Sequence, residues 1–273
     1  MGRILLILLA VVALAVPAAG CGGDDEDDEQ APAAGGVETV EQGVLTVGSD
    51  IPFEPFEYRE GGELTGFDVE LVEELAQRLD LEVRWVDTAF DTIFTQLAAG
   101  RYDVVASATT ITEERAQTVD FTEPYYAAQQ TVTVNIEQTP DIASVDDLSG
   151  GDTVAVQSGT TGEAWARENL PEGVELRSFP EAPNTYTALE AGNVTAVVFD
   201  EPSAVTEAER RPAVEVVQTI DTGERYGFGV DPQNPELLDA LNGALAEIKE
   251  DGTYQRLYDQ FEQLPPGGNI LEA

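Results

Sequence analysis

The chain has 273 residues, of which 42% are hydrophobic, and its 13 basic side chains stand against 53 acidic ones. This length suffices for one large or two small folded domains, and the net charge of -40 excludes the basic surface that nucleic-acid binding requires. Histidine is absent, which removes the usual general base, the serine and cysteine triads that depend on it, and the commonest transition-metal ligand.

The first 20 residues are typical of a secretory signal peptide. Arg3 precedes an apolar run over residues 4–16, and small residues follow up to Cys21, the only cysteine. The sequence AAGC at 18–21 resembles the lipobox of bacterial lipoproteins, in which the cysteine is acylated and becomes the new N-terminus. We therefore predict a signal peptide over 1–20 and lipidation of Cys21, with an ordinary signal peptide and an incidental cysteine as the alternative.

Residues 21–43 are predicted to form a flexible acidic tether behind the lipidated cysteine. The stretch GGDDEDDEQAPAAGG contains too little apolar surface to order itself. The sequence after this stretch contains no run of about 18 apolar residues, the length that would predict a membrane span. The sequence thus predicts a folded domain held by a lipid on the outer face of a membrane.

From Val44 the pattern is that of an α/β protein, because short apolar runs alternate with amphipathic stretches. Asp68 is a candidate N-cap for the first helix, and Gly100 is a candidate C-cap for the second. In chain order the predicted elements are a strand over 44–50, a helix over 67–79, a strand over 81–86, a helix over 91–99 and a strand over 102–107.

The layout of the first half recurs about ninety residues later. The stretch TALEAGNVTAVVFD (187–200) repeats TQLAAGRYDVVASA (95–108), with Thr, Leu, Ala, Gly and Val in register. Likewise TVAVQSG (153–159) corresponds to LTVGSD (45–50). Two repeated sequence patterns in the same order favour two related α/β lobes.

Two closing helices are predicted near the C-terminus. Apolar residues recur at helical spacing between Leu237 and Ile248, and the pattern stops at Gly252 and resumes after Thr253. The final segment, 264–273, is rich in Pro and Gly and is predicted to be a loose tail.

Ligands of open α/β sheets bind beyond the carboxyl ends of strands, and there the sequence offers a set of groups suited to a zwitterion. The fork of Arg115 suits a carboxylate, and the loop SGTTGEAWA enters a helix whose first amides add donors. Asp200 suits an ammonium group, and Phe53 and Phe90 suit the aliphatic part of a ligand. Each residue also has a structural alternative: Arg115 as a surface ion-pair partner of Asp120 or Glu113, Asp200 as a helix N-cap, and both phenylalanines as core.

Seven blocks carry a resemblance to a known family: GSDIPFEPFEY, GFDVELVEELAQRL, LAAGRYDVVASATTITEERAQTVDFTEPYY, VAVQSGTTGE, AVVFDEP, YGFGV and EDGTYQRLYDQF. In this order they resemble the amino-acid-type extracellular solute-binding proteins of ABC importers, over about residues 44–262. The resemblance implies an α/β, two-lobed clamp of the periplasmic-binding-protein type (type II), each lobe a small sheet flanked by helices. It places lobe 1 at 44–128 and 228–263, lobe 2 at 134–222, and two crossing hinge strands between them.

The resemblance also assigns roles by motif position. It gives the ligand α-carboxylate to Arg115, with Thr110 and the loop amides of Thr160 and Thr161. It gives the α-ammonium to Asp200 and to the carbonyl or hydroxyl of Ala108 or Ser107. Phe53 and Phe90 become the aromatic walls, and Asp50 and Gln157 line the side-chain pocket. Because Gln157 stands where several glutamine binders carry lysine, an acidic ligand is disfavoured, and polar neutral and basic amino acids remain open.

The function so implied is capture of a free amino acid by hinge closure and its delivery to an ABC permease, without catalysis, cofactor or metal. The expected location is the outer face of the cytoplasmic membrane, and the expected state is a monomer. Two alternatives stay open. One is a dehydratase of the cyclohexadienyl dehydratase type on the same fold, with Glu54 or Asp50 as the acid, and the other is the ligand-binding subunit of a sensory system.

Overall fold

A computed structural model describes residues 37–271 of the chain. The predicted signal peptide, Cys21 and most of the predicted tether lie outside the described residues. Between residues 37 and 271 no helix has the length and apolar character needed to cross a membrane.

The first sheet has five strands in the order β4-β1-β5-β12-β6. Strands β4 and β5 pair in parallel with β1, and β12 pairs antiparallel with β5 and β6. Buried apolar side chains of β1 explain its central place, because a strand covered on both faces must be apolar on both. The bounds are β1 Val44–Ser49, β4 Glu82–Asp87, β5 Val104–Val105, β6 Asp120–Phe121 and β12 Gly229–Val230.

The second sheet also has five strands, in the order β11-β7-β10-β8-β9. Strands β9, β8 and β10 are parallel, whereas β7 pairs antiparallel with both β10 and β11. A separate two-stranded ribbon joins β2 (Tyr58–Glu60) to β3 (Glu63–Thr65). The bounds of the second sheet are β7 Tyr126–Asn135, β8 Thr153–Gln157, β9 Glu175–Phe179, β10 Ala196–Asp200 and β11 Val214–Tyr226.

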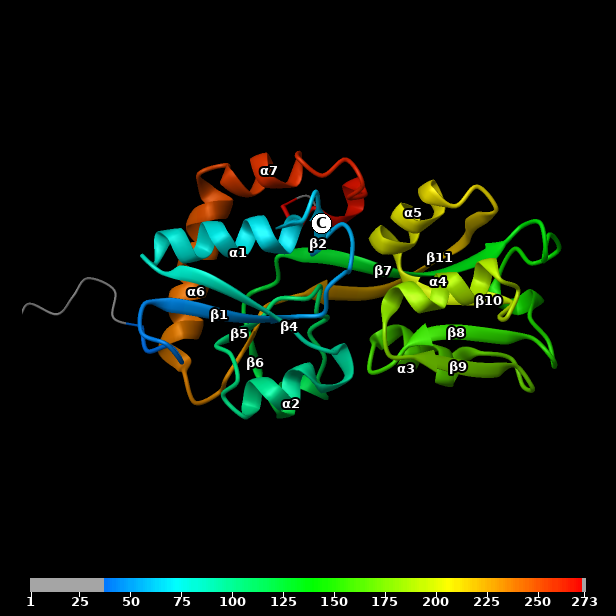
Figure 1. Cartoon of the computed structure of the whole chain (residues 1–273), viewed down its shortest axis with the longest axis horizontal. Helices are drawn as coiled ribbons and strands as arrows, with labels where there is room; N and C mark the ends of the chain where they lie inside the picture. The colour runs from blue at the N-terminus through cyan, green and yellow to red at the C-terminus, as the bar shows by residue number, and fades with distance from the viewer. Residues whose placement is uncertain (1–36, 272–273) are drawn as a thin grey trace, which may run out of the picture. The chain divides into compact units, whose positions relative to one another are not determined.

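Helices flank both sheets (Figure 1). Helix α1 packs on β4 and is itself covered by α6 and α7, and α2 packs on β1, β5 and β12. Helices α3, α4 and α5 pack on the second sheet. Their bounds are α1 Phe67–Arg78, α2 Ile93–Ala98, α3 Thr161–Asn169, α4 Ala182–Glu190, α5 Glu201–Arg210, α6 Pro235–Glu250 and α7 Thr253–Tyr258. Short 3-10 turns complete the chain: η1 Phe90–Thr92, η2 Arg115–Gln117, η3 Val145–Asp147 and η4 Pro266–Gly268.

Two long strands join the regions of the two sheets. Strand β7 follows β6 of the first sheet, and β11 runs directly into β12 of the first sheet. The two strands lie side by side (Figure 1), and their ladder has a register shift between Ile220 and Glu224. The chain therefore passes twice between the sheets, within a single antiparallel pair.

The predicted helix patterns are confirmed by the burial of their apolar positions. In α1, Leu71 and Leu75 are buried, and in α6 the residues Leu237, Leu241, Leu245 and Ile248 are all buried. The repeated sequence pattern is also present in three dimensions. Gly100 lies between α2 and β5, and Gly192 lies at the same place between α4 and β10; each has a φ of 69°. This is a left-handed conformation that glycine adopts without steric cost.

The predicted N-cap role of Asp68 is wrong. Helix α1 begins at Phe67, as predicted, but Gly66 occupies the N-cap position, and Asp68 lies inside the first turn and makes no capping bond. Its side chain is fully buried and accepts hydrogen bonds from the Ala108 amide and the Tyr125 hydroxyl instead. A partner forty residues away in the chain left no local signal in the sequence.

The segment from Leu264 to Leu271, for which the sequence predicts a loose tail, packs against the fold. Leu264 and Asn269 are buried, Gly268 lies against the Tyr126 ring, and Asn269 forms a bridge with Tyr126 in β7. The Tyr258 hydroxyl also donates to the Pro265 carbonyl at 2.5 Å. Turn residues here fold the chain back onto an aromatic surface.

Candidate functional site

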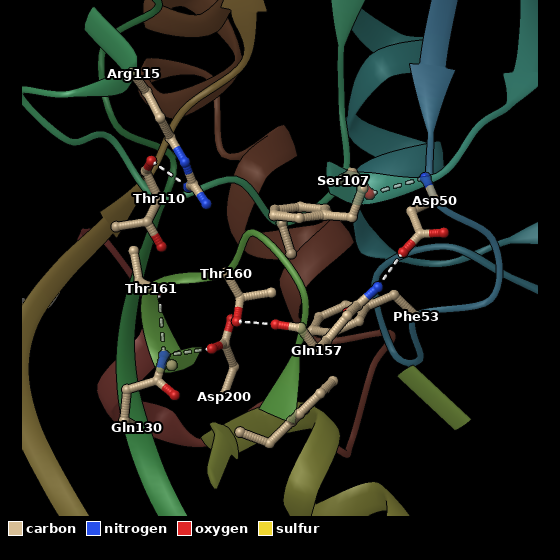
Figure 2. A pocket seen from close by; sticks show the side chains of 14 residues that line it. Asp50, Phe53, Ser107, Thr110, Arg115, Gln130, Gln157, Thr160, Thr161 and Asp200 are labelled. Carbon is tan, nitrogen blue, oxygen red and sulfur yellow. Dashed lines mark hydrogen bonds between the residues drawn. The ribbon is translucent and has the colours of Figure 1, made fainter. Parts of the chain in front are cut away.

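One cavity collects residues that follow strands of both sheets (Figure 2). Parallel strands place their carboxyl ends at one edge of a sheet. Here the ends of β1 and β5 meet those of β8 and β10. All eleven predicted ligand-binding residues line this cavity, together with Gln130, Gly162 and Phe199: they are Asp50, Phe53, Phe90, Ser107, Ala108, Thr110, Arg115, Gln157, Thr160, Thr161 and Asp200.

Arg115 joins the two sides of the cavity. Its Nη1 donates to the Thr110 carbonyl at 2.7 Å, and its Nη2 donates to the Gly159 carbonyl at 3.2 Å. The guanidinium also lies 5.3 Å from the ring centre of Phe90 and 5.0 Å from that of Phe94. Within residues 37–271 Arg115 forms no ion pair, so the proposed surface pairs with Glu113 and Asp120 are wrong. Burial lowers the pKa of Arg115, and the charges of Asp200 and Glu224 oppose that shift.

Asp200 occupies the N-cap position of α5 without capping it. Its Oδ1 accepts from Gln130 Nε2 at 2.5 Å, and its Oδ2 accepts a short hydrogen bond from the Tyr226 hydroxyl. Burial, followed by the charge of Glu224, raises the pKa of Asp200 to about 7. An added cation beside this carboxyl would favour its ionised form.

Asp50 lies on the other side of the cavity from Arg115 (Figure 2). Its Oδ2 accepts from Gln157 Nε2 at 2.5 Å, and its amide donates to Ser107 Oγ at 3.0 Å. Burial raises the pKa of Asp50 to about 6, with Asp87 among the acids that add to the shift.

Aromatic rings close the cavity between these polar groups. Phe53 and Phe90 are only 9% and 8% exposed, and the Phe53 ring lies 5.5 Å from that of Phe199. Both residues therefore belong to the core and to the wall of the cavity at once. Glu54 is not among the residues that line the cavity and forms an ion pair with Arg210 of α5.

The loop into α3 brings its hydroxyls to the cavity. Thr160 is the N-cap of α3, and its hydroxyl accepts from the Glu163 amide at 3.1 Å and donates to the Gln157 carbonyl at 2.8 Å. Thr161, the first residue of the helix, donates its hydroxyl to Glu224 Oε2 at 2.8 Å.

The sequence pattern predicted neither of two polar residues: Gln130, which lines the cavity, and Glu224, whose hydrogen-bond partners line it. Glu224 of β11 accepts hydrogen bonds from Thr110 Oγ1 at 2.6 Å, from Thr161 Oγ1 and, at 3.2 Å, from Gln130 Nε2. Gln130 of β7 is fully buried, and its Oε1 has no hydrogen-bond partner within residues 37–271. Both residues lie in the segments near 128–134 and 222–228, where the family resemblance implies the hinge crossings, and polar side chains within those segments are the signal that marks them.

Comparison with solved structures finds close agreement in fold. An ancestral arginine-binding protein bound to glutamine superposes with a TM-score of 0.78 at 36% identity, covering 82% of this chain and 100% of the other. The ancestral amino acid-binding protein AncCDT-1, a precursor of cyclohexadienyl dehydratase, superposes with a TM-score of 0.75 at 39% identity, covering 80% and 95%. These neighbours are amino-acid-binding proteins with the same arrangement of two α/β lobes.

Sequence relatives agree with this picture. The probable histidine-binding protein of Campylobacter jejuni is 32% identical over 80% of this chain and 84% of the relative, and the L-cystine-binding protein TcyJ of Escherichia coli K12 is 33% identical over 81% and 83%. The family description "Bacterial extracellular solute-binding proteins, family 3" matches residues 45–263, and an extracytoplasmic location accords with it. The chain is thus a member of the family 3 bacterial extracellular solute-binding proteins.

Proposed function

We propose that this protein is the substrate-binding component of an ABC amino-acid importer and that it binds a free polar or basic L-amino acid. The observation that carries the proposal is the distribution of charge in the cavity. Arg115 and Asp200 both line the cavity, each charge acts on the pKa of the other, and Asp50 lies on the other side of the cavity from Arg115 (Figure 2). This is the pattern that a backbone carboxylate, a backbone ammonium and a polar or cationic side chain require.

The carboxylate end is assigned to Arg115, Thr110 and the amides of Thr160 and Thr161. The guanidinium fork gives two charge-assisted bonds, each worth about 1.5–3 kcal/mol. The ammonium end is assigned to Asp200 and to Ser107 or Ala108, and Asp50 with Gln157 receives the ligand's side chain. The relatives named for histidine, cystine and arginine support this range of ligands.

Capture requires that the walls of the cavity separate. The volume that the centre of a water molecule can occupy in the cavity is about 20 Å³, which is room for one or two waters. The contacts of Gln157 with Asp50 and of Arg115 with Gly159 join the two sides. Bending of β7 and β11 opens them, and the ligand's better contacts with the closed form draw them together again.

Delivery to a membrane permease and anchoring through a lipid on Cys21 complete the proposal, and a monomer suffices for both. The decisive experiment is a thermal-shift screen of the twenty amino acids on the chain from Val37 onward. Binding by one or a few polar or basic amino acids raises the melting temperature. Stabilisation by none of them, or conversion of the ligand into a product, contradicts the proposal.

A further inference from the structure

Two buried carboxyl groups stand directly behind the part of the cavity wall formed by Ser107 and Ala108. Glu57 precedes β2 and Asp68 lies in α1, and the side chains of both are fully buried. Neither forms an ion pair within residues 37–271. Buried carboxyl groups without a cation are costly and call for an explanation.

Glu57 fixes the direction of the Ser107 hydroxyl. Ser107 Oγ donates to Glu57 Oε1 at 2.7 Å and accepts from the Asp50 amide at 3.0 Å. A hydroxyl has one proton and two lone pairs. With its proton given to Glu57 and one lone pair given to Asp50, Ser107 has a single lone pair left for the cavity, so it faces a ligand as an acceptor.

Asp68 holds the neighbouring residue in place. Its Oδ2 accepts from the Ala108 amide at 2.9 Å and from the Tyr125 hydroxyl at 2.8 Å. Ala108 has a φ of 45°, in the left-handed region that a residue with a side chain adopts at a cost. The hydrogen bond that the Ala108 amide donates to Asp68 offsets that cost and fixes the turn that lines the cavity.

Each carboxyl group keeps one oxygen without a hydrogen-bond partner among residues 37–271, Oε2 of Glu57 and Oδ1 of Asp68. Burial and the charge of Asp68 raise the pKa of Glu57 well above its usual value, and the charge of Asp50 adds to this. Burial raises the pKa of Asp68 to about 6, against the bonds from Ala108 and Tyr125. Since Asp68 has two donors on one oxygen, it is the better site for the negative charge, and Glu57 is the better site for a proton.

We propose that Glu57 is a positioning residue for the ammonium end of the site. As a neutral carboxylic acid it accepts a hydrogen bond from the Ser107 hydroxyl and directs its own proton toward Asp68. Ser107 is thereby kept as an acceptor for the ligand's ammonium group. This inference rests on the proposed function.

The test compares Glu57→Gln with Glu57→Leu in the full chain, by the ratio of dissociation constants for L-arginine and des-amino-arginine, which lacks the α-ammonium. L-glutamine and its des-amino analogue replace them if glutamine stabilises the protein more. Glutamine at position 57 offers an acceptor to Ser107 and a donor to Asp68, so it keeps the wild-type preference for the amino acid. Leucine offers neither and lowers that preference about tenfold, the equivalent of one hydrogen bond. Asp103→Leu is the matched control, because Asp103 is a buried carboxyl that holds the Val40 and Thr46 amides.

The Asp103 control lowers the melting temperature without changing the preference. An equal loss in Glu57→Gln and Glu57→Leu shows that the charge of Glu57 is needed and overturns the proposal, as does an unchanged preference in Glu57→Leu. If Glu57→Leu does not fold, infrared spectra at pH 8 decide. Asp50, Asp68 and Asp200 are then mostly ionised, so the wild type retains a protonated-carboxyl band that Glu57→Gln lacks, and absence of that band overturns the proposal. If no amino acid binds the wild type, the proposed function fails and the positioning role falls with it.

Discussion

Gln157 is the last residue of β8 and Asp50 follows β1 of the other sheet, yet Nε2 of Gln157 donates a 2.5 Å hydrogen bond to Oδ2 of Asp50. The contact joins the end of β8 to the end of β1 across the cavity. It also shows how the predicted side-chain pocket is built, since Gln157 brings a neutral amide and no positive charge to the Asp50 carboxylate. The predictions that follow from this arrangement concern ligand choice, affinity, pH and location.

Asp50→Asn distinguishes basic from neutral ligands. The change removes the charge but keeps an oxygen for Gln157, so binding of L-arginine weakens by about tenfold or more, whereas binding of L-glutamine changes by less than about threefold. Isothermal titration measures both. Glu82→Gln, an exposed acid at the start of β4, serves as the control. Equal losses for both ligands argue against Asp50 as the side-chain receptor.

Arg115→Ala abolishes amino-acid binding and leaves the fold intact. Two charge-assisted bonds of about 1.5–3 kcal/mol each are lost, which corresponds to at least about a hundredfold in affinity. Titration gives the affinity, and circular dichroism gives the fold. Arg177→Ala is the matched control, because Arg177 also stacks on a ring, that of Phe179, but does not line the cavity. An unaltered dissociation constant in Arg115→Ala would return this residue to a structural role.

Asp200 makes both stability and binding depend on pH. Because its pKa in the folded protein is raised to about 7 from the ordinary value of 3.8, its contribution to stability is fully present below about pH 4 and is lost as the pH rises through 7. In urea unfolding without ligand, the free energy of unfolding of Asp200→Asn therefore declines less over this pH range than that of the wild type.

The affinity for the ligand depends on pH for the same reason. The ligand's ammonium group favours the ionised form of Asp200, so wild-type affinity rises by about one to two orders of magnitude from pH 5 to 7, and Asp200→Asn reduces this rise. A pH-independent affinity in the wild type would refute the assignment.

Removal of the Glu224 carboxylate strengthens binding. Glu224 accepts the hydroxyls of Thr110 and Thr161, and Thr110 is assigned to the ligand carboxylate. Glu224→Ala frees these donors and removes a like charge near that carboxylate, so affinity rises about tenfold. Glu215→Ala, an exposed position on the same strand, is the control. Weaker binding in Glu224→Ala would instead show that Glu224 helps to hold the ligand.

Cys21→Ser releases the protein from membranes, because lipidation requires the thiol. Fractionation of cells into membrane and soluble parts measures this, with Ala18→Leu as a control that keeps the cysteine and the processing site. Persistent membrane association of the serine variant contradicts a lipid anchor.

The cavity wall was predictable from sequence wherever it is built from strand ends. Residues such as Asp50 and Asp200 directly follow apolar runs, and parallel topology brings such ends together. Gln130 and Glu224 lie within β7 and β11 among other polar residues, and nothing local marks Gln130 as lining the cavity or Glu224 as the partner of residues that line it. Asp68 shows the same limit, since its position near a helix start suggested a cap, whereas its partner Ala108 lies on another element.

The packed segment from Leu264 to Leu271 bears on where the strand pair can bend. Gly268 and Asn269 hold Tyr126 at the first residue of β7, and Tyr126 also stacks on Tyr226, the last residue of β11. One end of each strand is thus clamped to the same aromatic stack. We therefore expect rotation between the two sheets to occur in the few residues between this stack and the register shift before Glu224, which include Ala128, so that a small change of backbone angle there would move the walls of the cavity apart.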